Sequence, residues 1–167
     1  MGSEGPTLLE PLWQGPAPID PSAVSGSVSC ALPARYEAVK GARQFTGSTL
    51  RQWNLSELLD EVALVVSELV TNALRHALPG GPAPGEPERP VRLHLMRGPS
   101  RLVCAVRDPS AVGPVAPGET GCGEESGRGL HLVESFTDGW GWQPLADATR
   151  GKIVWAVFHL PTHAQPG

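Results

Sequence analysis

The sequence predicts an α+β domain, a two-layer sandwich in which a mixed, mostly antiparallel sheet carries helices on one face. The expected order of elements is a strand, two helices, and then further strands with one more helix among them. The 18 prolines and 20 glycines gather in the N-terminal region and in two loops, so they leave the expected helices and strands largely uninterrupted. At 167 residues, the chain is long enough to bury the core of one such domain.

The chain is expected to begin with a disordered N-terminal tail at residues 1–26. Residues 1–26 are rich in Pro, Gly and Ser, which predicts disorder, although their apolar cluster at residues 8–13 would also suit a short docking segment. The folded domain is expected over residues 27–160, followed by a C-terminal tail at 161–167. Residues 27–32 predict the first strand, and an apolar stripe over residues 33–53 predicts the first helix. Gly41 and Gly47 weaken this stripe, and Gly47 is a candidate position for a kink or break.

The second helix is the clearest element of the sequence. Residues 57–77 are rich in Leu, Ala, Val and Glu and contain neither Gly nor Pro. Ser56 is expected to cap the helix, and acidic residues follow in its first turns, where the helix dipole favours negative charge. Pro79 and Gly80 end it.

Polar side chains interrupt the apolar surface of this second helix. Glu68 and Asn72 lie one turn apart, and Thr71 lies beside them. A carboxylate and a carboxamide on so apolar a helix are costly unless they find partners. They are therefore candidates for a functional site, the alternative being that they lie on a solvated face.

The remaining elements follow two Gly- and Pro-rich loops. After the loop at residues 78–90, the pattern predicts a hairpin of strands at 91–96 and 102–106 with a turn at 98–100, and Asp108 ends the second strand. The loop at 109–126 is long enough to be a lid that becomes ordered with a ligand. The last predicted elements are a helix at 127–137, a strand at 138–142, a turn at 146–151 and a strand at 152–159.

Composition excludes several classes of function. With 17 acidic and 13 basic residues, the chain lacks the basic face that nonspecific nucleic-acid binding needs. Three cysteines without CxxC spacing indicate neither a disulfide framework nor a zinc site. We expect a cytoplasmic protein without a signal peptide and without a membrane span, because the N-terminus has no basic segment and no apolar run is long enough.

Three motifs occur in a meaningful order along the chain. Glu68-x-x-x-Asn72 comes first, a strand ending in Asp108 comes second, and Gly127-x-Gly129 at the start of a helix comes third. This order resembles the ATP-binding proteins of the GHKL superfamily and implies their Bergerat-type fold. The segments SELVTNALRHA, VRDPS, ESGRGLHLVESFTDGWG and GKIVWAVF are similar to the stand-alone serine kinases that act as bacterial anti-sigma factors. The resemblance covers residues 28–160.

The resemblance implies ATP and Mg²⁺ as cofactors and gives each motif a role. Glu68 is expected to be the general base, Asn72 the Mg²⁺ ligand through its amide oxygen, and Thr71 a neighbour of the nucleotide. Asp108 is expected to accept the amino hydrogen of adenine. The glycines allow the backbone to approach phosphate at the positive end of a helix. The expected residues of this loop are Ser126, Gly127, Arg128, Gly129 and Leu130.

Three positions depart from the pattern of that family: the residues after Asp108, the residues after Gly151, and Val157, where related chains often carry an acid. Asp108 is followed by Pro109 and Ser110 where Asp-x-Gly-x-Gly is usual, which alters the expected lid. Gly151 is followed by Lys152 and Ile153 where a Thr usually stands near adenine. Either one hydroxyl contact to the base is lost, or Asp108 binds adenine with less support.

The leading hypothesis is an ATP-dependent protein serine/threonine kinase that acts as an anti-sigma factor. The resemblance implies that it phosphorylates an anti-sigma antagonist and sequesters a sigma factor, without direct contact with nucleic acid or membrane. In that family the first strand and helix help to form the dimer and partner surface, so a homodimer is compatible with the resemblance. The alternative is an ATP-binding regulatory module that binds partners without transferring phosphate.

Overall fold

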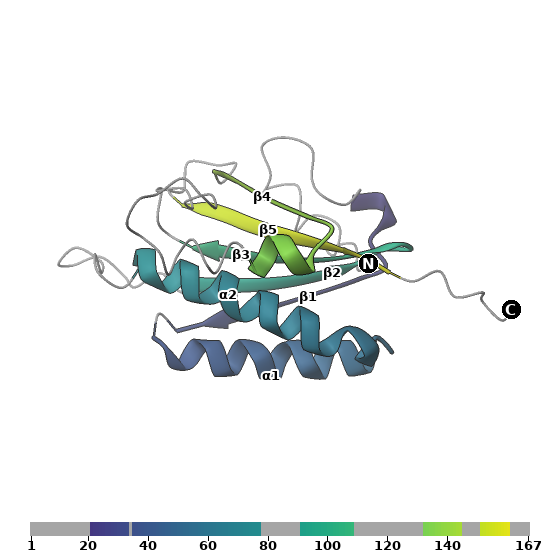
Figure 1. Cartoon of the computed structure of the whole chain (residues 1–167), viewed down its shortest axis with the longest axis horizontal. Helices are drawn as coiled ribbons and strands as arrows, with labels where there is room; N and C mark the ends of the chain where they lie inside the picture. Colours follow the sequence, from purple (N-terminus) through teal and green to yellow (C-terminus); the bar gives the residue numbers. More distant parts are fainter. Residues whose placement is uncertain (1–20, 34, 78–90, 109–131, 145–150, 161–167) are drawn as a thin grey trace, which may run out of the picture.

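The computed structural model describes residues 21–33, 35–77, 91–108, 132–144 and 151–160. Two long helices lie on one face of a five-stranded sheet with the strand order β1-β2-β3-β5-β4 (Figure 1). Residues 132–136 are also helical. The elements are η3 (Pro21–Ala23), β1 (Gly26–Leu32), α1 (Glu37–Gln52), η4 (Ser56–Leu58), α2 (Leu59–Ala77), β2 (Val91–Arg97), β3 (Arg101–Asp108), β4 (Gly139–Pro144) and β5 (Lys152–His159).

The α+β fold class predicted from the sequence is confirmed. Every pairing among the described strands is antiparallel, so the parallel component of the expected mixed sheet is not found in this part of the chain. The predicted hairpin of β2 and β3 closes at Gly98, whose N–H donates to the carbonyl of Arg101 over 2.8 Å. The lid predicted at 109–126, the start of the helix predicted at 127–137 and the tail at 161–167 lie outside the described residues, as does the N-terminal tail up to residue 20.

The main core fills the layer between the sheet and the two helices. Alternate residues of β3, namely Leu102, Cys104 and Val106, are fully or almost fully buried there together with Val66 and Leu69 of α2. α2 packs on β3 and, to a smaller extent, on β2 and β5, while α1 packs beside α2 and on β1. The apolar surface predicted for the second helix is thus the surface that joins the two layers.

The opposite face of the sheet is buried as well. Met96, Val103, Ala105, Ile153 and Val157 form a second buried cluster on that face. Burial on both faces explains why β3 is an almost continuous apolar run instead of alternating between apolar and polar residues. In the described part of the chain, no helix has the length and the apolar character that crossing a membrane requires.

Two details of the helices differ from the predictions. Ser56 does not cap a helix that starts at Glu57, because both residues belong to the 3₁₀ turn η4 and α2 starts at Leu59. Gly47 does not break the first helix, since α1 is continuous from Glu37 to Gln52. Gly47 and Leu50 are buried in this helix, and tertiary packing of this kind outweighs the low helix propensity of a single glycine.

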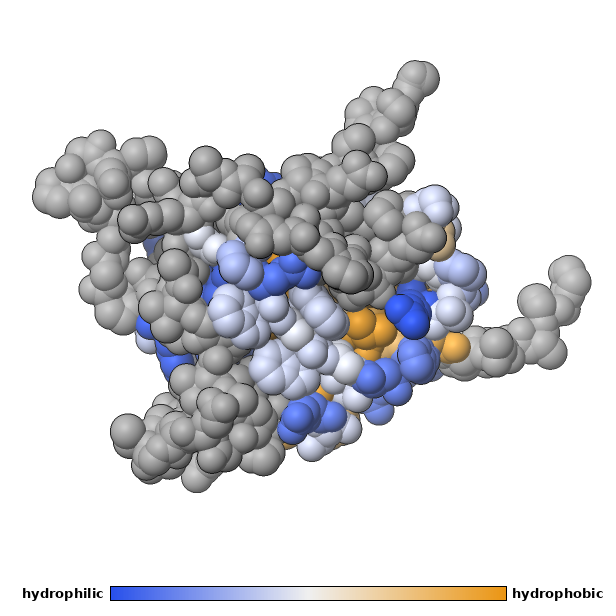
Figure 2. Space-filling view, turned by 90° about the horizontal axis from the view of Figure 1, so that it is seen from above, coloured by the Kyte–Doolittle hydropathy of each residue, from blue (hydrophilic) through white to orange (hydrophobic). Residues whose placement is uncertain are grey.

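Strand β4 forms one edge of the sheet. It pairs only with β5 among the described strands, and its side chain Trp142 is 41% exposed. Figure 2 views the molecule from above Figure 1, on the side where β4 is drawn, and its coloured surface is mostly hydrophilic or intermediate with a small hydrophobic area. The ring of Trp155 packs directly against the backbone of Gly141 and leaves no room for a side chain there. A Cβ added at Gly141 would lie 2.5 Å from this ring.

Replacing Gly141 by alanine should therefore destabilise the edge of the sheet. The new methyl group would force the Trp155 ring out of place, and overpacking of this kind typically costs about 1–3 kcal/mol. Gly139→Ala is the matched control in the same strand, because an added Cβ there meets nothing within 4 Å. Urea unfolding should show a lower free energy of unfolding for Gly141→Ala only. Equal values for the two variants would contradict the close contact.

Candidate functional site

The polar residues of α2 occupy different environments. Asn72 is buried, with 6% of its surface exposed, whereas Glu68 and Thr71 are partly exposed. The alternative of a solvated face therefore fails for Asn72. Glu68 and Asn72 are four residues apart on one continuous helix, so they share a face and stand one above the other. The helix thus presents a partly accessible carboxylate next to a buried amide.

Asp108 is the last residue of β3, and its side chain is buried. Side chains two residues apart in a strand point to the same face of the sheet. Asp108 therefore shares the face of Cys104 and Val106, which is the face that the helices cover. The predicted carboxylate at the end of a central strand is present, and it points toward the layer in which α2 packs.

Lys152 is the partner of Asp108. It is the first residue of β5, directly opposite Asp108 in the antiparallel register. Its Nζ donates a hydrogen bond to Oδ1 of Asp108 at 3.1 Å and lies 2.9 Å from Oδ2. Both side chains are completely buried, so each charge is compensated by the other within the protein. Gly151 precedes Lys152 with a φ of 133°, a conformation that favours glycine.

In the sequence, Lys152 is recognisable only as a departure from a family pattern, and its ion pair with Asp108 was not predicted. The available signal was a single lysine in the apolar strand KIVWAVF, because a lysine is almost never fully buried unless it is paired. Asp108 was the nearest acid at the end of a neighbouring predicted strand. The antiparallel register that brings the two residues together could not be obtained from periodicity alone.

The candidate residues come from two layers that pack together, the helix α2 and the sheet. α2 contributes Glu68, Thr71 and Asn72, and the strands on which α2 packs contribute Asp108 and Lys152. The other predicted residues of the nucleotide site lie outside the described residues, namely Ser126, Gly127, Arg128, Gly129 and Leu130. The helical residues 132–136 follow that segment, and Val133 among them is part of the main core.

Two further ionisable side chains in the described interior, Cys104 and His94, are held in their neutral forms near pH 7. Burial raises the pKa of the Cys104 thiol to about 12, so it is not a nucleophile near pH 7. Burial, assisted by the charges of Arg92 and Arg107, lowers the pKa of His94 to about 4. His94 shares the strand face of Met96, which is turned away from α2. Neither group adds charge or a nucleophile to the candidate site.

The donor atoms suit a magnesium ion held together with a nucleotide. Among the residues that the structure describes, no three or more His, Cys, Asp or Glu side chains are grouped so as to hold a metal. Mg²⁺ prefers oxygen ligands and usually takes only one or two protein ligands beside substrate phosphates and water. The amide oxygen of Asn72 fits that role.

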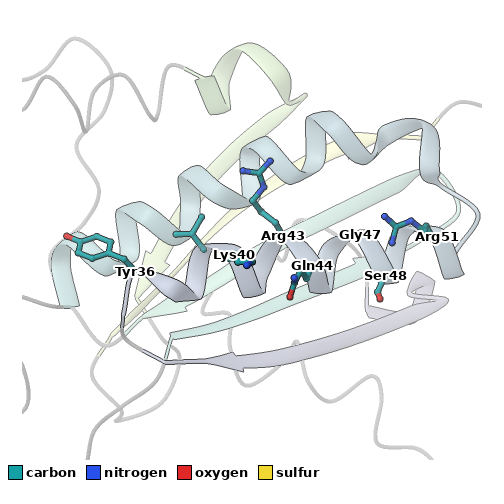
Figure 3. A pocket seen from close by; sticks show the side chains of 8 residues that line it. Tyr36, Lys40, Arg43, Gln44, Gly47, Ser48 and Arg51 are labelled. Carbon is teal, nitrogen blue, oxygen red and sulfur yellow. The ribbon is translucent and has the colours of Figure 1, made fainter.

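A shallow hollow lies along α1, apart from these candidates (Figure 3). Its lining includes the cationic side chains Lys40, Arg43 and Arg51 and no acidic residue. All its lining residues come from α1 or the residue just before it, so it shares no residue with the candidate site on α2 and the strands. The full lining is Tyr36, Val39, Lys40, Arg43, Gln44, Gly47, Ser48 and Arg51.

Comparisons with known proteins identify the family and the fold. The family model of the histidine kinase-like ATPase domain matches residues 32–158. The fold is similar to a chain in the crystal structure of the SiaB–SiaC complex from Pseudomonas aeruginosa, with a TM-score of 0.53 and 9% sequence identity over 83% of this chain and 91% of that chain. No curated protein matches the sequence.

Removing one member of the buried ion pair should destabilise the fold far more than removing both. Asp108→Asn leaves a buried ammonium and Lys152→Met leaves a buried carboxylate, and each loss of this kind costs about 3–5 kcal/mol. The double variant removes both charges and should lose much less than the sum of the two single losses. Urea unfolding of all four proteins measures this coupling. Additive losses would show that the two charges do not depend on each other.

Proposed function

The chain belongs to the family of histidine kinase-like ATPase domains, and from this membership we propose that it is an ATP-dependent protein serine/threonine kinase acting as an anti-sigma factor. It would phosphorylate an anti-sigma antagonist and sequester a sigma factor in the cytoplasm. The single observation that carries the proposal is the arrangement of Glu68 and Asn72. A partly exposed carboxylate stands one helical turn from a buried amide, on the helix that packs against the strand ending in Asp108.

Asn72 is the proposed Mg²⁺ ligand. Its burial limits the conformations that its amide group can adopt. Bound Mg²⁺ would supply neutralisation of the phosphate charge, which is a large part of what phosphoryl transfer requires. Thr71, beside Asn72 and partly exposed, is placed to hydrogen-bond near the nucleotide.

Glu68 is the proposed general base. Its partial exposure leaves the carboxylate accessible to a serine or threonine hydroxyl of a protein substrate. The carboxylate accepts the hydroxyl proton as the hydroxyl oxygen bonds to the terminal phosphorus, and the bond from that phosphorus to the ADP oxygen breaks. The residue needs to contact the hydroxyl but not the nucleotide, because transfer depends mainly on positioning and charge neutralisation.

The remaining parts of the proposed nucleotide site are assigned by the motifs. Asp108 would face the base, and residues 126–130 would face the phosphates through backbone N–H groups and the positive end of a helix. Residues 27–160 would form the kinase domain between the two tails.

Protein partners are part of the proposal. The similar fold from Pseudomonas aeruginosa was solved in a complex named for two proteins, SiaB and SiaC, which supports a role that involves a protein partner. On this chain, the cationic hollow along α1 is a candidate surface for a partner or for a second copy, because side chains of one sign attract an acidic surface.

The second candidate function is an ATP-binding regulatory module that transfers no phosphate. Two departures from the family pattern keep it open: Pro109 and Ser110 follow Asp108 where glycines are usual, and Lys152 follows Gly151 where a Thr is usual. The same proteins would then be bound under the control of nucleotide, without covalent change.

Glu68→Gln distinguishes the two functions. This variant keeps the shape of the side chain and removes its basicity, so phosphate transfer should fall by about 10²–10⁴-fold while Mg·ATP binding changes little. Transfer of labelled phosphate to the antagonists encoded by the same genome measures the first quantity, and calorimetric titration measures the second.

Two further variants serve as references for this test. Glu61→Gln alters an exposed glutamate of the same helix and should leave both quantities unchanged. Asn72→Ala removes the proposed metal ligand, so Mg²⁺-dependent binding and transfer should fall together. A wild-type protein that binds ATP but transfers nothing would support the regulatory module, and normal transfer by Glu68→Gln would show that another residue is the base.

A further inference from the structure

The ammonium of Lys152 occupies the hydrogen-bonding edge of Asp108. Its Nζ lies 2.9 Å and 3.1 Å from the two carboxylate oxygens, which are the distances that an amino group of a bound base would adopt. Both side chains are completely buried, so water does not weaken the contact. The contact is also held by the backbone, because Asp108 and Lys152 are direct neighbours in the paired strands β3 and β5.

We propose that Lys152 is a specificity-determining residue of the nucleotide site and that it weakens discrimination between adenine and guanine. This inference rests on the proposed nucleotide binding. A base amino group must compete with a fixed internal ammonium for the Asp108 carboxylate. Nucleotide affinity then comes mainly from the phosphates and Mg²⁺, which ATP and GTP share.

The chemistry of the two purines explains why a lysine has this effect. An uncompensated carboxylate accepts a hydrogen bond from the 6-amino group of adenine and repels the 6-oxo group of guanine, because an ionised carboxylate can only accept. An ammonium only donates, and it cancels the negative charge that causes the repulsion. The paired groups carry no net charge, so the amino group of adenine loses its attraction to the site and the oxygen of guanine meets no repulsion.

The family pattern has a Thr at the position that Lys152 occupies after Gly151. Where a Thr stands beside the carboxylate, the hydroxyl leaves the negative charge of the acid intact. In this chain Lys152 stands at the corresponding place, as the first residue of β5 after Gly151. One substitution can therefore return the site to an uncompensated carboxylate with a small hydroxyl neighbour.

The experiment compares the dissociation constants of Mg·ATP and Mg·GTP for the wild type, Lys152→Thr and Lys152→Arg, after thermal melting has verified that each variant is folded. The wild type should bind the two nucleotides within about threefold of each other. Lys152→Thr should raise the preference for ATP by about tenfold or more, which is the discrimination that a hydrogen bond to a charged group supplies. Lys152→Arg keeps a cation beside Asp108 and should keep the wild-type ratio.

Three outcomes would contradict the proposed effect of Lys152. A wild type that already prefers ATP by more than about thirtyfold, a difference of about 2 kcal/mol, overturns it, and this measurement needs no variant. A folded Lys152→Thr protein with an unchanged ratio also overturns it, while the proposed ATP binding stands. Failure of every folded protein to bind either nucleotide would instead overturn the proposed nucleotide site, and the inference with it.

Discussion

The buried ion pair of Asp108 and Lys152 is the constraint on which the sheet and the candidate site both depend. Neither side chain is in contact with solvent, so each charge is compensated by the other. Removal of either one would leave an uncompensated charge in the interior. A shift of one residue in the pairing of β3 and β5 would turn Lys152 to the other face of the sheet and separate the charges. The pair therefore favours a single register for β3 and β5, two strands that contribute buried residues to both apolar clusters. It also means that a change at Asp108 affects stability as well as any contact with a base.

The helix α2 packs on the sheet and also bears Glu68 and Asn72, two residues of the candidate site. Its apolar residues, such as Val66 and Leu69, bind the helix layer to the sheet, and the same packing brings a buried Asn72 to the side of the helix that also bears Glu68. The core thus holds in place the helix that bears the residues proposed as metal ligand and general base. The partial exposure of Glu68 is compatible with its proposed role, since the proposed base must be accessible to a protein substrate. The stability of the domain and its proposed function consequently both depend on the packing of α2 against the sheet.

The sequence predicted the order and kind of the elements because their periodicities are strong. Residues 152–159 were predicted as a strand with the bounds that β5 has, and the apolar surface of α2 was recognised. The start of α2 was placed two residues early, because Ser56 suits both a helix cap and the 3₁₀ turn in which it lies. At the site, Asn72 and Asp108 were identified as candidates, and the structure shows both buried. The ion pair was missed, because partners in an antiparallel sheet are fixed by register, and Asp108 and Lys152 are 44 residues apart in the chain.

We propose that Mg·ATP binds between α2, the last residue of β3 and the first residue of β5. A titration of the isotope-labelled protein with Mg·ATP, followed by NMR, tests it directly, because each residue reports separately. The backbone signals of Glu68, Asn72 and Asp108 and the side-chain amide signal of Asn72 should shift with one common dissociation constant. The signals of Ser48, which lines the separate hollow on α1, should not follow them. Shifts confined to α1, or no shift at saturating Mg·ATP, would contradict the claim.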